Sequence, residues 1–129
     1  MVPELTVADF SRSRAFYVEV LGFDVRFERS DPDFAYLILN GAQLMLEAEH
    51  DSSWQTGTLD APRGQGINLQ IEVADVVALR ESVLAAGYPL FRDLVESRYD
   101  VGNGQQEGQL EFLLQDPDGY LLRFVEPTT

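Results

Sequence analysis

The most informative feature of this sequence is what it lacks. Its 129 residues include no cysteine, no lysine and a single histidine, His50. Such a chain has no disulfide framework, no cysteine-bound metal cluster, no Schiff-base lysine and no P-loop lysine. No apolar run approaches the roughly 20 residues that a membrane-spanning helix needs. The opening residues also lack the basic and apolar regions of a signal peptide, so we expect a cytoplasmic protein.

Positive charge is scarce as well. The chain has 22 acidic residues against 9 basic ones, all of them arginine, and its formal net charge is −13. A field of this sign repels nucleic acids and anionic membranes and attracts cations. The composition therefore argues against nucleic-acid and membrane partners. A chain of this length, 45% hydrophobic, is typical of a single domain.

One pattern occurs twice along the chain. Leu5-Thr6-Val7-Ala8-Asp9 resembles Ile71-Glu72-Val73-Ala74-Asp75, at an offset of 66 residues. Each copy is followed by an amphipathic stretch and then by a glycine, Gly22 or Gly87. An aspartate can cap the start of a helix and a glycine can end it. The apolar faces of the two predicted helices are formed by Phe16, Tyr17 and Val20 and by Val76, Leu79 and Val83.

Three short strands are expected after each helix. We place them at residues 24–28, 34–39 and 43–48 in the first half and at 89–93, 109–115 and 120–125 in the second. Asn40-Gly41 predicts a hairpin turn and Asp116-Pro117-Asp118-Gly119 a type I turn. The resulting single domain comprises repeat 1 (about 1–48), a linker (about 49–66) and repeat 2 (about 67–126). Residues 95–108 read as a second long loop, and long loops act either as functional lids or as plain connectors.

This order of elements resembles the vicinal oxygen chelate superfamily, which includes glyoxalase I, extradiol dioxygenases and bleomycin-binding resistance proteins. The resemblance rests on Leu5-Thr6-Val7-x-Asp9, Ser13-x-x-Phe16-Tyr17, Leu21-Gly22-Phe23 and Asp116-Pro117-Asp118-Gly119-Tyr120. It implies an α+β fold in which two βαβββ repeats form curved mixed sheets around a concave cup, with the helices outside.

Enzymes of that superfamily hold a divalent metal with four His, Gln or Glu side chains. The resemblance carries those four positions over to Val2, Met45, Asn68 and Arg123. Valine and methionine offer no hard ligand, and arginine brings a positive charge to a cation site. We therefore expect no metal and no other cofactor, and without a Lewis acid we favour a protein that is not an enzyme.

Strand alternation indicates which side chains line the predicted cup. Four inward carboxylates would form an acidic tray, with Arg123 as a counter-charge. The inward residues are Glu4, Glu47, Asn68, Gln70, Glu72, Glu111 and Arg123. Each glutamate is equally consistent with a solvated sheet face, and paired carboxylates also suggest acid–base catalysis. We favour a tray for cations because it agrees with the net charge.

Within the superfamily the sequence most resembles the bleomycin-binding resistance proteins. The shared features are Val2-Pro3-x-Leu5-Thr6, Asp33-Phe34-Ala35 and the Glu111-Phe112 pair. The resemblance implies a metal-free homodimer that sequesters cationic glycopeptide antibiotics of the bleomycin group and confers resistance without modifying the drug. Asp33 and Phe34 match the family's groove residues. Trp54 is either a stacking platform or a plug over the core.

Three alternatives remain. The chain is also compatible with a glyoxalase-like lyase or a dioxygenase, with a binder of another small cationic ligand, and with a module that binds a basic peptide. One departure from the bleomycin-binding pattern is Gly108, which stands where that family has an aromatic residue, so one ring of the groove is either absent or supplied by Tyr99.

Overall fold

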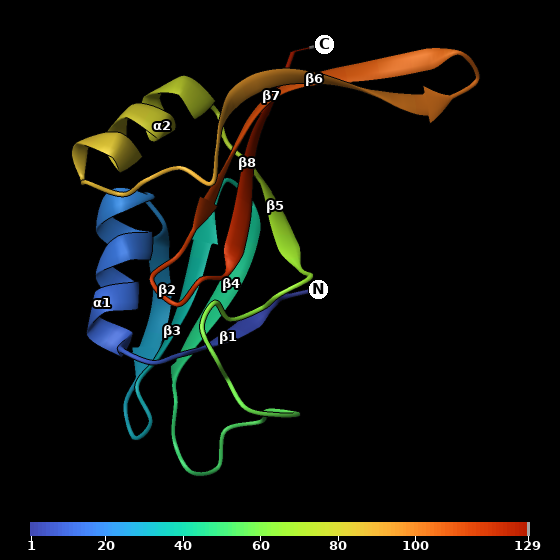
Figure 1. The fold of residues 1–129 in the computed structure, drawn as a ribbon. Helices are drawn as coiled ribbons and strands as arrows, with labels where there is room; N and C mark the ends of the chain where they lie inside the picture. Colours follow the sequence, from blue (N-terminus) through green and yellow to red (C-terminus); the bar gives the residue numbers. More distant parts are fainter. Residues whose placement is uncertain (129) are drawn as a thin grey trace.

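The computed structural model describes residues 1–128, which form two consecutive modules with the same order of elements (Figure 1). The first module contains β1 (Glu4–Val7), α1 (Phe10–Ala15), the π-helical turn η1 (Phe16–Val20), β2 (Asp24–Arg29), β3 (Phe34–Leu39) and β4 (Ala42–Ala48). The second contains β5 (Asn68–Glu72), α2 (Val76–Ala85), β6 (Arg92–Gly102), β7 (Gln105–Gln115) and β8 (Leu121–Pro127).

Each module builds its own four-stranded mixed sheet. The strand orders are β1-β4-β3-β2 and β5-β8-β7-β6. The pairs β1–β4 and β5–β8 are parallel, and the other neighbouring strands are antiparallel. The α+β class with two βαβββ repeats, predicted from the sequence, is confirmed.

The helices begin and end at the predicted signals. The carboxylates of Asp9 and Asp75 each accept a hydrogen bond from the backbone N–H three residues later, at 3.2 and 3.0 Å. Gly22 and Gly87 follow the two helical segments with φ of 84° and 88°, a conformation that side chains with a Cβ disfavour. Within residues 1–128, neither helix has the length and apolar character required to cross a membrane.

The first helical segment differs from the second because it widens into η1. Phe16 and Tyr17 are adjacent in sequence, yet both are buried. An ordinary α-helix turns successive side chains by about 100°, whereas a π-turn is wider. The two rings pack edge to face, 5.2 Å apart. The turn therefore brings two consecutive aromatic side chains into the core.

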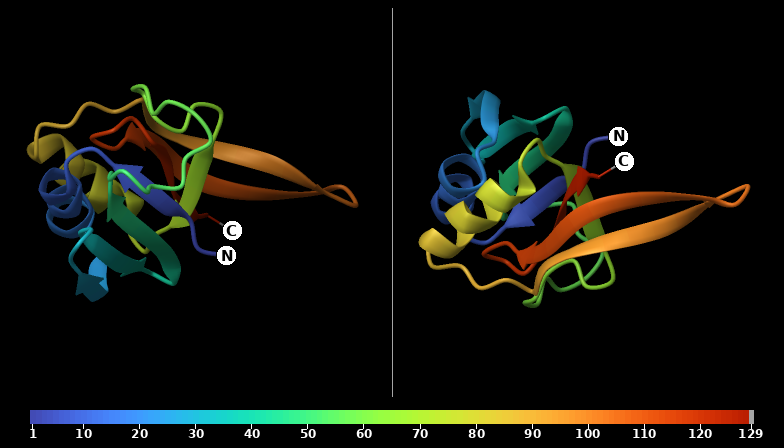
Figure 2. Two further views of the ribbon diagram at one scale, coloured as in Figure 1. Left: turned by 90° about the horizontal axis from the view of Figure 1, so that it is seen from below. Right: turned by 90° about the horizontal axis from the view of Figure 1, so that it is seen from above.

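The core lies between the helices and one face of both sheets. Figures 1 and 2 show α1 and α2 side by side on that face. Alternate strand residues point into the core, as the period of two predicts. The least exposed members of the core are Val7, Tyr17, Ala35, Leu37, Leu46, Val76, Val83, Phe112, Leu114, Leu122 and Phe124.

The turn between β7 and β8 joins the two modules. The Gly119 N–H donates to the Asp116 carbonyl at 2.9 Å, as expected for the predicted turn. The Tyr17 hydroxyl of the first module donates to the buried Asp116 carboxylate at 2.7 Å. The Asp118 carboxylate accepts from the Ala8 N–H at 3.2 Å. A turn that the sequence marks as a local feature therefore also holds the modules together.

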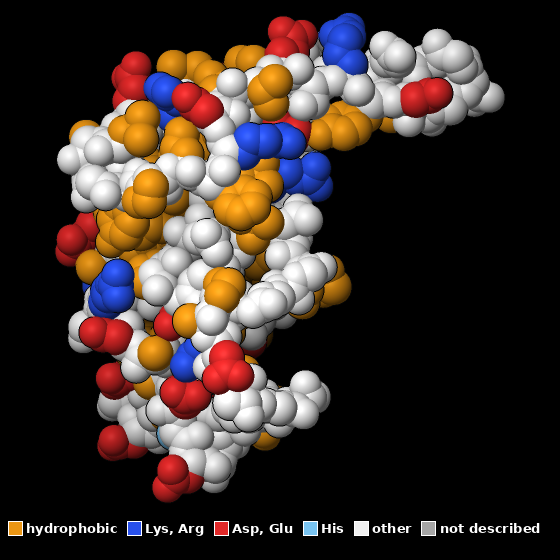
Figure 3. Space-filling view, in the orientation of Figure 1, with side chains coloured by type: hydrophobic (Ala, Val, Ile, Leu, Met, Phe, Trp, Pro, Cys, Tyr) orange, Lys and Arg blue, Asp and Glu red, His pale blue; other side chains and the backbone are white. Residues whose placement is uncertain are grey.

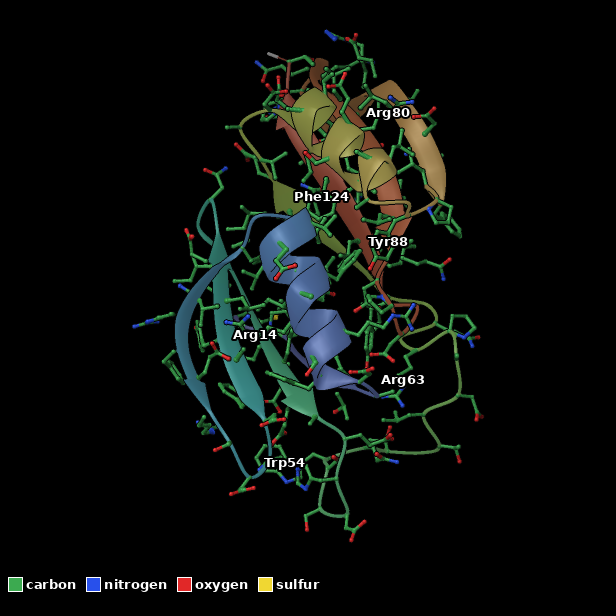
Figure 4. All side chains as sticks on the ribbon, turned by 90° about the vertical axis from the view of Figure 1, so that its left-hand side faces the viewer. Arg14, Trp54, Arg63, Arg80, Tyr88 and Phe124 are labelled. Carbon is green, nitrogen blue, oxygen red and sulfur yellow. The ribbon has the colours of Figure 1, made fainter. Side chains whose placement is uncertain are left out.

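The linker adds further contacts at the same junction. The Arg63 guanidinium donates to the Thr6 carbonyl at 2.9 Å, and the Tyr120 hydroxyl donates to the same carbonyl at 3.0 Å. Arg63 lies beside the first module in Figure 4, although it belongs to a linker segment that forms neither helix nor strand. The edge strand β1 is thus fastened to the second module.

The expectation of a loop at residues 95–108 is wrong. These residues belong to β6 and β7, whose pairing continues outward to Gly102 and Gln105. The two strands form a hairpin that projects beyond the rest of the molecule (Figures 1 and 2). It turns at Asn103-Gly104, which have φ of 55° and 70°. This is the same dipeptide as Asn40-Gly41, so the hairpin signal was present in the sequence.

Candidate functional site

The sheet surfaces turned away from the helices form the hollowed side of the molecule, between the projecting hairpin and the linker (Figure 3). Face A is the exposed surface of the first sheet. Its residues are Glu4, Phe27, Arg29, Phe34, Tyr36, Met45 and Glu47. Face B is the corresponding surface of the second sheet. Its residues are Gln70, Glu72, Arg92, Glu111, Leu113 and Arg123.

Face A contains an acidic pocket under the linker. The pocket has a volume of about 320 Å³ and is lined by Glu4, Arg29, Glu47, His50, Ser52 and Trp54. Burial raises the pKa of Glu4, as do the charge of Glu47 and a hydrogen bond shared with it, while the charge of Arg29 opposes the rise. Two carboxylates that repel each other form a site where a cation is favoured.

An aromatic row lies beside this pocket. The rings of Phe27 and Phe34 are stacked with centroids 5.8 Å apart, and those of Phe27 and Tyr36 are 5.2 Å apart. The Arg29 guanidinium lies 3.9 Å from the Phe34 ring centroid, and Phe34 is only 2% exposed. Phe34 is therefore covered, whereas Phe27 is accessible.

Trp54 lies in the linker at the edge of face A, away from the core (Figure 4). Its side chain is 94% exposed. Of the two interpretations of Trp54, a plug over the core is wrong, because a plug would be buried. An exposed indole beside two carboxylates is free to stack on a flat cation.

Face B has a different character because Glu111 is buried within a polar network. Its Oε1 accepts from Arg92 at 2.9 Å, from Ser97 at 2.8 Å and from Tyr99 at 2.6 Å. Its Oε2 accepts from Gln109 at 2.8 Å and lies 3.8 Å from an Arg123 nitrogen. The resulting cluster contains two guanidinium groups and one carboxylate.

This network keeps Glu111 ionised. Burial opposes its charge, but the hydrogen bonds from Tyr99, Ser97 and Gln109 and the charge of Arg123 outweigh burial and lower the pKa of Glu111. Glu111 is 0% exposed, so it is not an open member of an acidic tray. The expected single tray is replaced by an acidic pocket on face A and a guanidinium-rich cluster on face B.

The remaining predicted site residues are not members of either cluster, although Gln70 is the register partner of Arg123. Asn68 and Gln70 line a cavity of about 510 Å³ between the start of β1, the start of β4 and β5. Glu72 is exposed at the end of β5. Asp33 is exposed before β3, where its carbonyl accepts from the Ala48 N–H at 2.9 Å. No contact joins Asp33 to the face A pocket among the described residues.

Sequence reasoning missed residues on both faces. On face A they are Arg29, His50 and Ser52, and on face B they are Arg92, Ser97 and Gln109. The sequence does contain a strand signal for the face B residues that come from β6. Val95, Ser97, Tyr99 and Val101 alternate with charged residues, as expected for a strand, but the surrounding glycines and glutamines suggested a loop.

The residues at the superfamily's metal positions do not fit a divalent metal. Val2 has no donor atom, and Met45 lies between Glu4 and Tyr36 in the sheet register. Arg123 carries a positive charge. Within residues 1–128, no group of three or more histidine, aspartate or glutamate side chains is arranged to hold a metal ion. The donor set argues against metal chemistry at these positions.

Comparison with known proteins identifies the family. A model described as the Glyoxalase/Bleomycin resistance protein/Dioxygenase superfamily matches residues 2–124, and the chain belongs to this superfamily. A curated relative is the lactoylglutathione lyase of Haemophilus influenzae, 26% identical over 126 residues, which cover 95% of this chain and 87% of that protein. This relative is a lyase and not a bleomycin-binding protein.

Solved structures share the fold. TioX from Micromonospora sp. ML1 is 21% identical with a TM-score of 0.73, and the match covers 100% of this chain and 96% of TioX. A protein of unknown function from Agrobacterium tumefaciens str. C58 is 25% identical with a TM-score of 0.71, and the match covers 96% of this chain and 90% of that one.

Proposed function

We propose that the protein binds a small cationic ligand with planar rings on face A and does not modify it. The ligand class we expect is the bleomycin group of antibiotics, which the protein would sequester to give resistance. The observation that carries the proposal is the pair Glu4 and Glu47, held close together beside the exposed ring of Trp54.

The electrostatics of the pocket support a cation. A ligand cation placed between Glu4 and Glu47 would relieve their repulsion and lower the pKa of Glu4. Binding would then release a proton, so affinity should increase as the pH rises through the pKa of free Glu4. The attraction is partly exposed to solvent, so affinity should fall as salt is added.

Calorimetry with metal-free and copper-loaded bleomycin tests the proposal. Glu47→Gln removes one carboxylate of the pocket and should weaken binding about three- to tenfold, with a flatter salt dependence. Glu81→Gln is the matched control, because Glu81 is an exposed carboxylate on α2, outside face A. Mass analysis of the recovered drug checks that it is unmodified. Absence of binding heat for the unaltered protein would reject bleomycin as the ligand.

We also propose that the chain acts as a homodimer. Faces A and B each present a half-cup, and the projecting hairpin carries exposed apolar side chains at Val95, Tyr99 and Val101. A second copy would cover these side chains and close the hollow into grooves. Light scattering should report about twice the 14.5 kDa mass of one chain. A monomer at micromolar concentration would contradict this part of the proposal.

A second candidate function is suggested by the Haemophilus influenzae relative, which is a lactoylglutathione lyase. The absence of a suitable donor set at Val2, Met45, Asn68 and Arg123 weighs against it. Elemental analysis of the purified protein and a lactoylglutathione lyase assay with added divalent metals separate the two functions. Near one metal per chain, together with activity lost on its removal, would favour the lyase.

A further inference from the structure

Arg123 is a partly enclosed cation for which the described residues supply no hydrogen-bond acceptor. Its side chain is 28% exposed, and its nearest charged partner is Glu111, at 3.8 Å, which is longer than a hydrogen bond. Its Nε is buried and has no acceptor among the described residues. Enclosed polar groups are normally paired, and an unpaired one needs an explanation. The guanidinium thus retains donors for a group that is not part of this chain.

Glu111 cannot act as the hydrogen-bond acceptor that Arg123 lacks. Its Oε1 already accepts three hydrogen bonds, and its Oε2 is engaged by Gln109. One carboxylate therefore stands between two guanidinium groups, which leaves an excess of one positive charge. Arg92 uses one nitrogen to bind Glu111, and its side chain is 51% exposed. Arg92 is hydrogen-bonded to Glu111 and Arg123 lies only within ion-pair distance of it, so both guanidinium groups keep N–H groups that Glu111 does not engage.

The neighbouring charged and polar groups do not neutralise this excess positive charge. Glu72 lies in the same register row as Glu111, but β8 separates them, with Val125 between the two. Gln70 is the register partner of Arg123 on the neighbouring strand and carries no charge. Arg98, further out on the hairpin, pairs with Glu96 at 3.6 Å. Within this cluster the two guanidinium groups therefore outnumber the one carboxylate, on a protein of net charge −13.

We propose that Arg92 and Arg123, oriented by Glu111, form a binding site on face B for the carboxylate group of a small molecule. A planar guanidinium matches a carboxylate through two parallel N–H···O bonds. At a position that the superfamily uses to ligate a cation, this chain supplies the cation itself. The site is distinct from the acidic pocket of face A and stands or falls independently of the proposed antibiotic binding.

Nitrogen-15 NMR of the arginine Nε–H groups tests the site, with sodium malonate as the probe and sodium chloride holding the ionic strength constant. The Nε–H signals of Arg123 and Arg92 should shift and saturate, with a dissociation constant on the order of 1 mM. Arg14 and Arg80 are internal controls, because their Nε atoms already donate to Glu28 at 2.9 Å and to Asp93 at 2.6 Å. Their signals should stay in place.

Three variants sharpen the test. Arg123→Gln should weaken malonate binding at least about tenfold, whereas the control Arg80→Gln should leave it unchanged. Arg123→Lys keeps the charge but loses the planar fork and should fall between them. Shifts of equal size at all four arginines, or no saturable shift at Arg123, would overturn the proposal. If Arg123→Gln instead dissociates a dimer and malonate causes no shift, the missing acceptor belongs to a second copy and the proposal is wrong.

Discussion

Faces A and B are built by the same sequence of elements but have opposite chemistry. On face A two carboxylates, Glu4 and Glu47, face each other with few donors, and the pKa of Glu4 is raised. On face B one carboxylate, Glu111, collects hydrogen bonds between two arginines, and its pKa is lowered. The comparison shows that the repeated backbone fixes where a side chain points, whereas the local balance of donors and charges decides its role.

The largest expected effect is on stability, at the centre of face B. Glu111→Ala leaves Arg92, Ser97 and Tyr99 without their shared acceptor. It should lower the free energy of unfolding by about 2–4 kcal/mol, measured by urea denaturation. Glu96→Ala is the control, since the Glu96–Arg98 pair is exposed and its loss should cost less than about 0.5 kcal/mol. Equal effects of the two variants would show that the buried Glu111 carboxylate contributes no more to stability than the exposed Glu96–Arg98 ion pair.

The same carboxylate should make stability depend on pH. Because the pKa of Glu111 is lower in the folded chain than its ordinary 4.5, its contribution is present above pH 4.5 and is lost as the pH falls through the folded value. Glu111→Gln should therefore flatten the acid side of the stability profile. An acid profile identical to that of the unaltered protein would show that Glu111 is not the titrating group.

A smaller effect is expected where the two modules meet. Tyr17→Phe removes the hydroxyl that donates to the buried Asp116 carboxylate at 2.7 Å. The loss should lower the free energy of unfolding by about 1–2 kcal/mol, because the carboxylate keeps only its backbone donors. Thermal and urea unfolding measure it. A change within about 0.3 kcal/mol would mean that this contact does not help to join the modules.

On face A the expected effect falls on binding and not on stability. Trp54→Ala should weaken bleomycin binding roughly tenfold, since a stacked ring contributes on the order of 1 kcal/mol beyond its buried area. Its unfolding free energy should change by less than about 0.5 kcal/mol, because the side chain is 94% exposed. Phe34→Ala is the contrasting variant: Phe34 is 2% exposed, so its loss should mainly destabilise the fold.

The smallest expected effect has the opposite sign. Glu4→Gln removes one of two repelling carboxylates and should raise the unfolding free energy at neutral pH by a few tenths of a kcal/mol, since the pair is partly solvated. The gain should disappear at acid pH, where Glu4 is protonated in the unaltered protein. A loss of stability at neutral pH would show that Glu4 is stabilised by Arg29 more than it is repelled by Glu47.

Prediction from the sequence succeeded where the signal is local. The aspartate caps, the glycines after both helices and the turn at Asp116 depend on residues within four positions of one another. The alternation of buried and exposed residues in β1, β4 and β5 needs only the period of a strand. These features were sufficient to establish the superfamily's order of elements.

Prediction was weaker where partners lie far apart in the sequence. Alternation correctly pointed Glu111 to the face opposite the helices, but it gave no information on its neighbours. Three of those neighbours, Arg92, Ser97 and Tyr99, come from β6, which was expected to be mostly loop, and the nearest of the three is 12 residues away in sequence. Phe34 was expected to face a ligand, yet Arg29 covers its ring.

The sequence by itself determined the repeat, the strand and helix periods, the acidic net charge and the absence of a suitable metal-ligand set. The first three depend on residue identity and spacing alone, and the fourth depends on the residues at the four positions that the resemblance to the superfamily marks. Only the tertiary structure decided that Glu4 and Glu47 share a pocket with Trp54, and that Glu111 is shared between Arg92 and Arg123. These outcomes depend on which side chains meet across strands, because burial and neighbouring charges are properties of the assembled sheet.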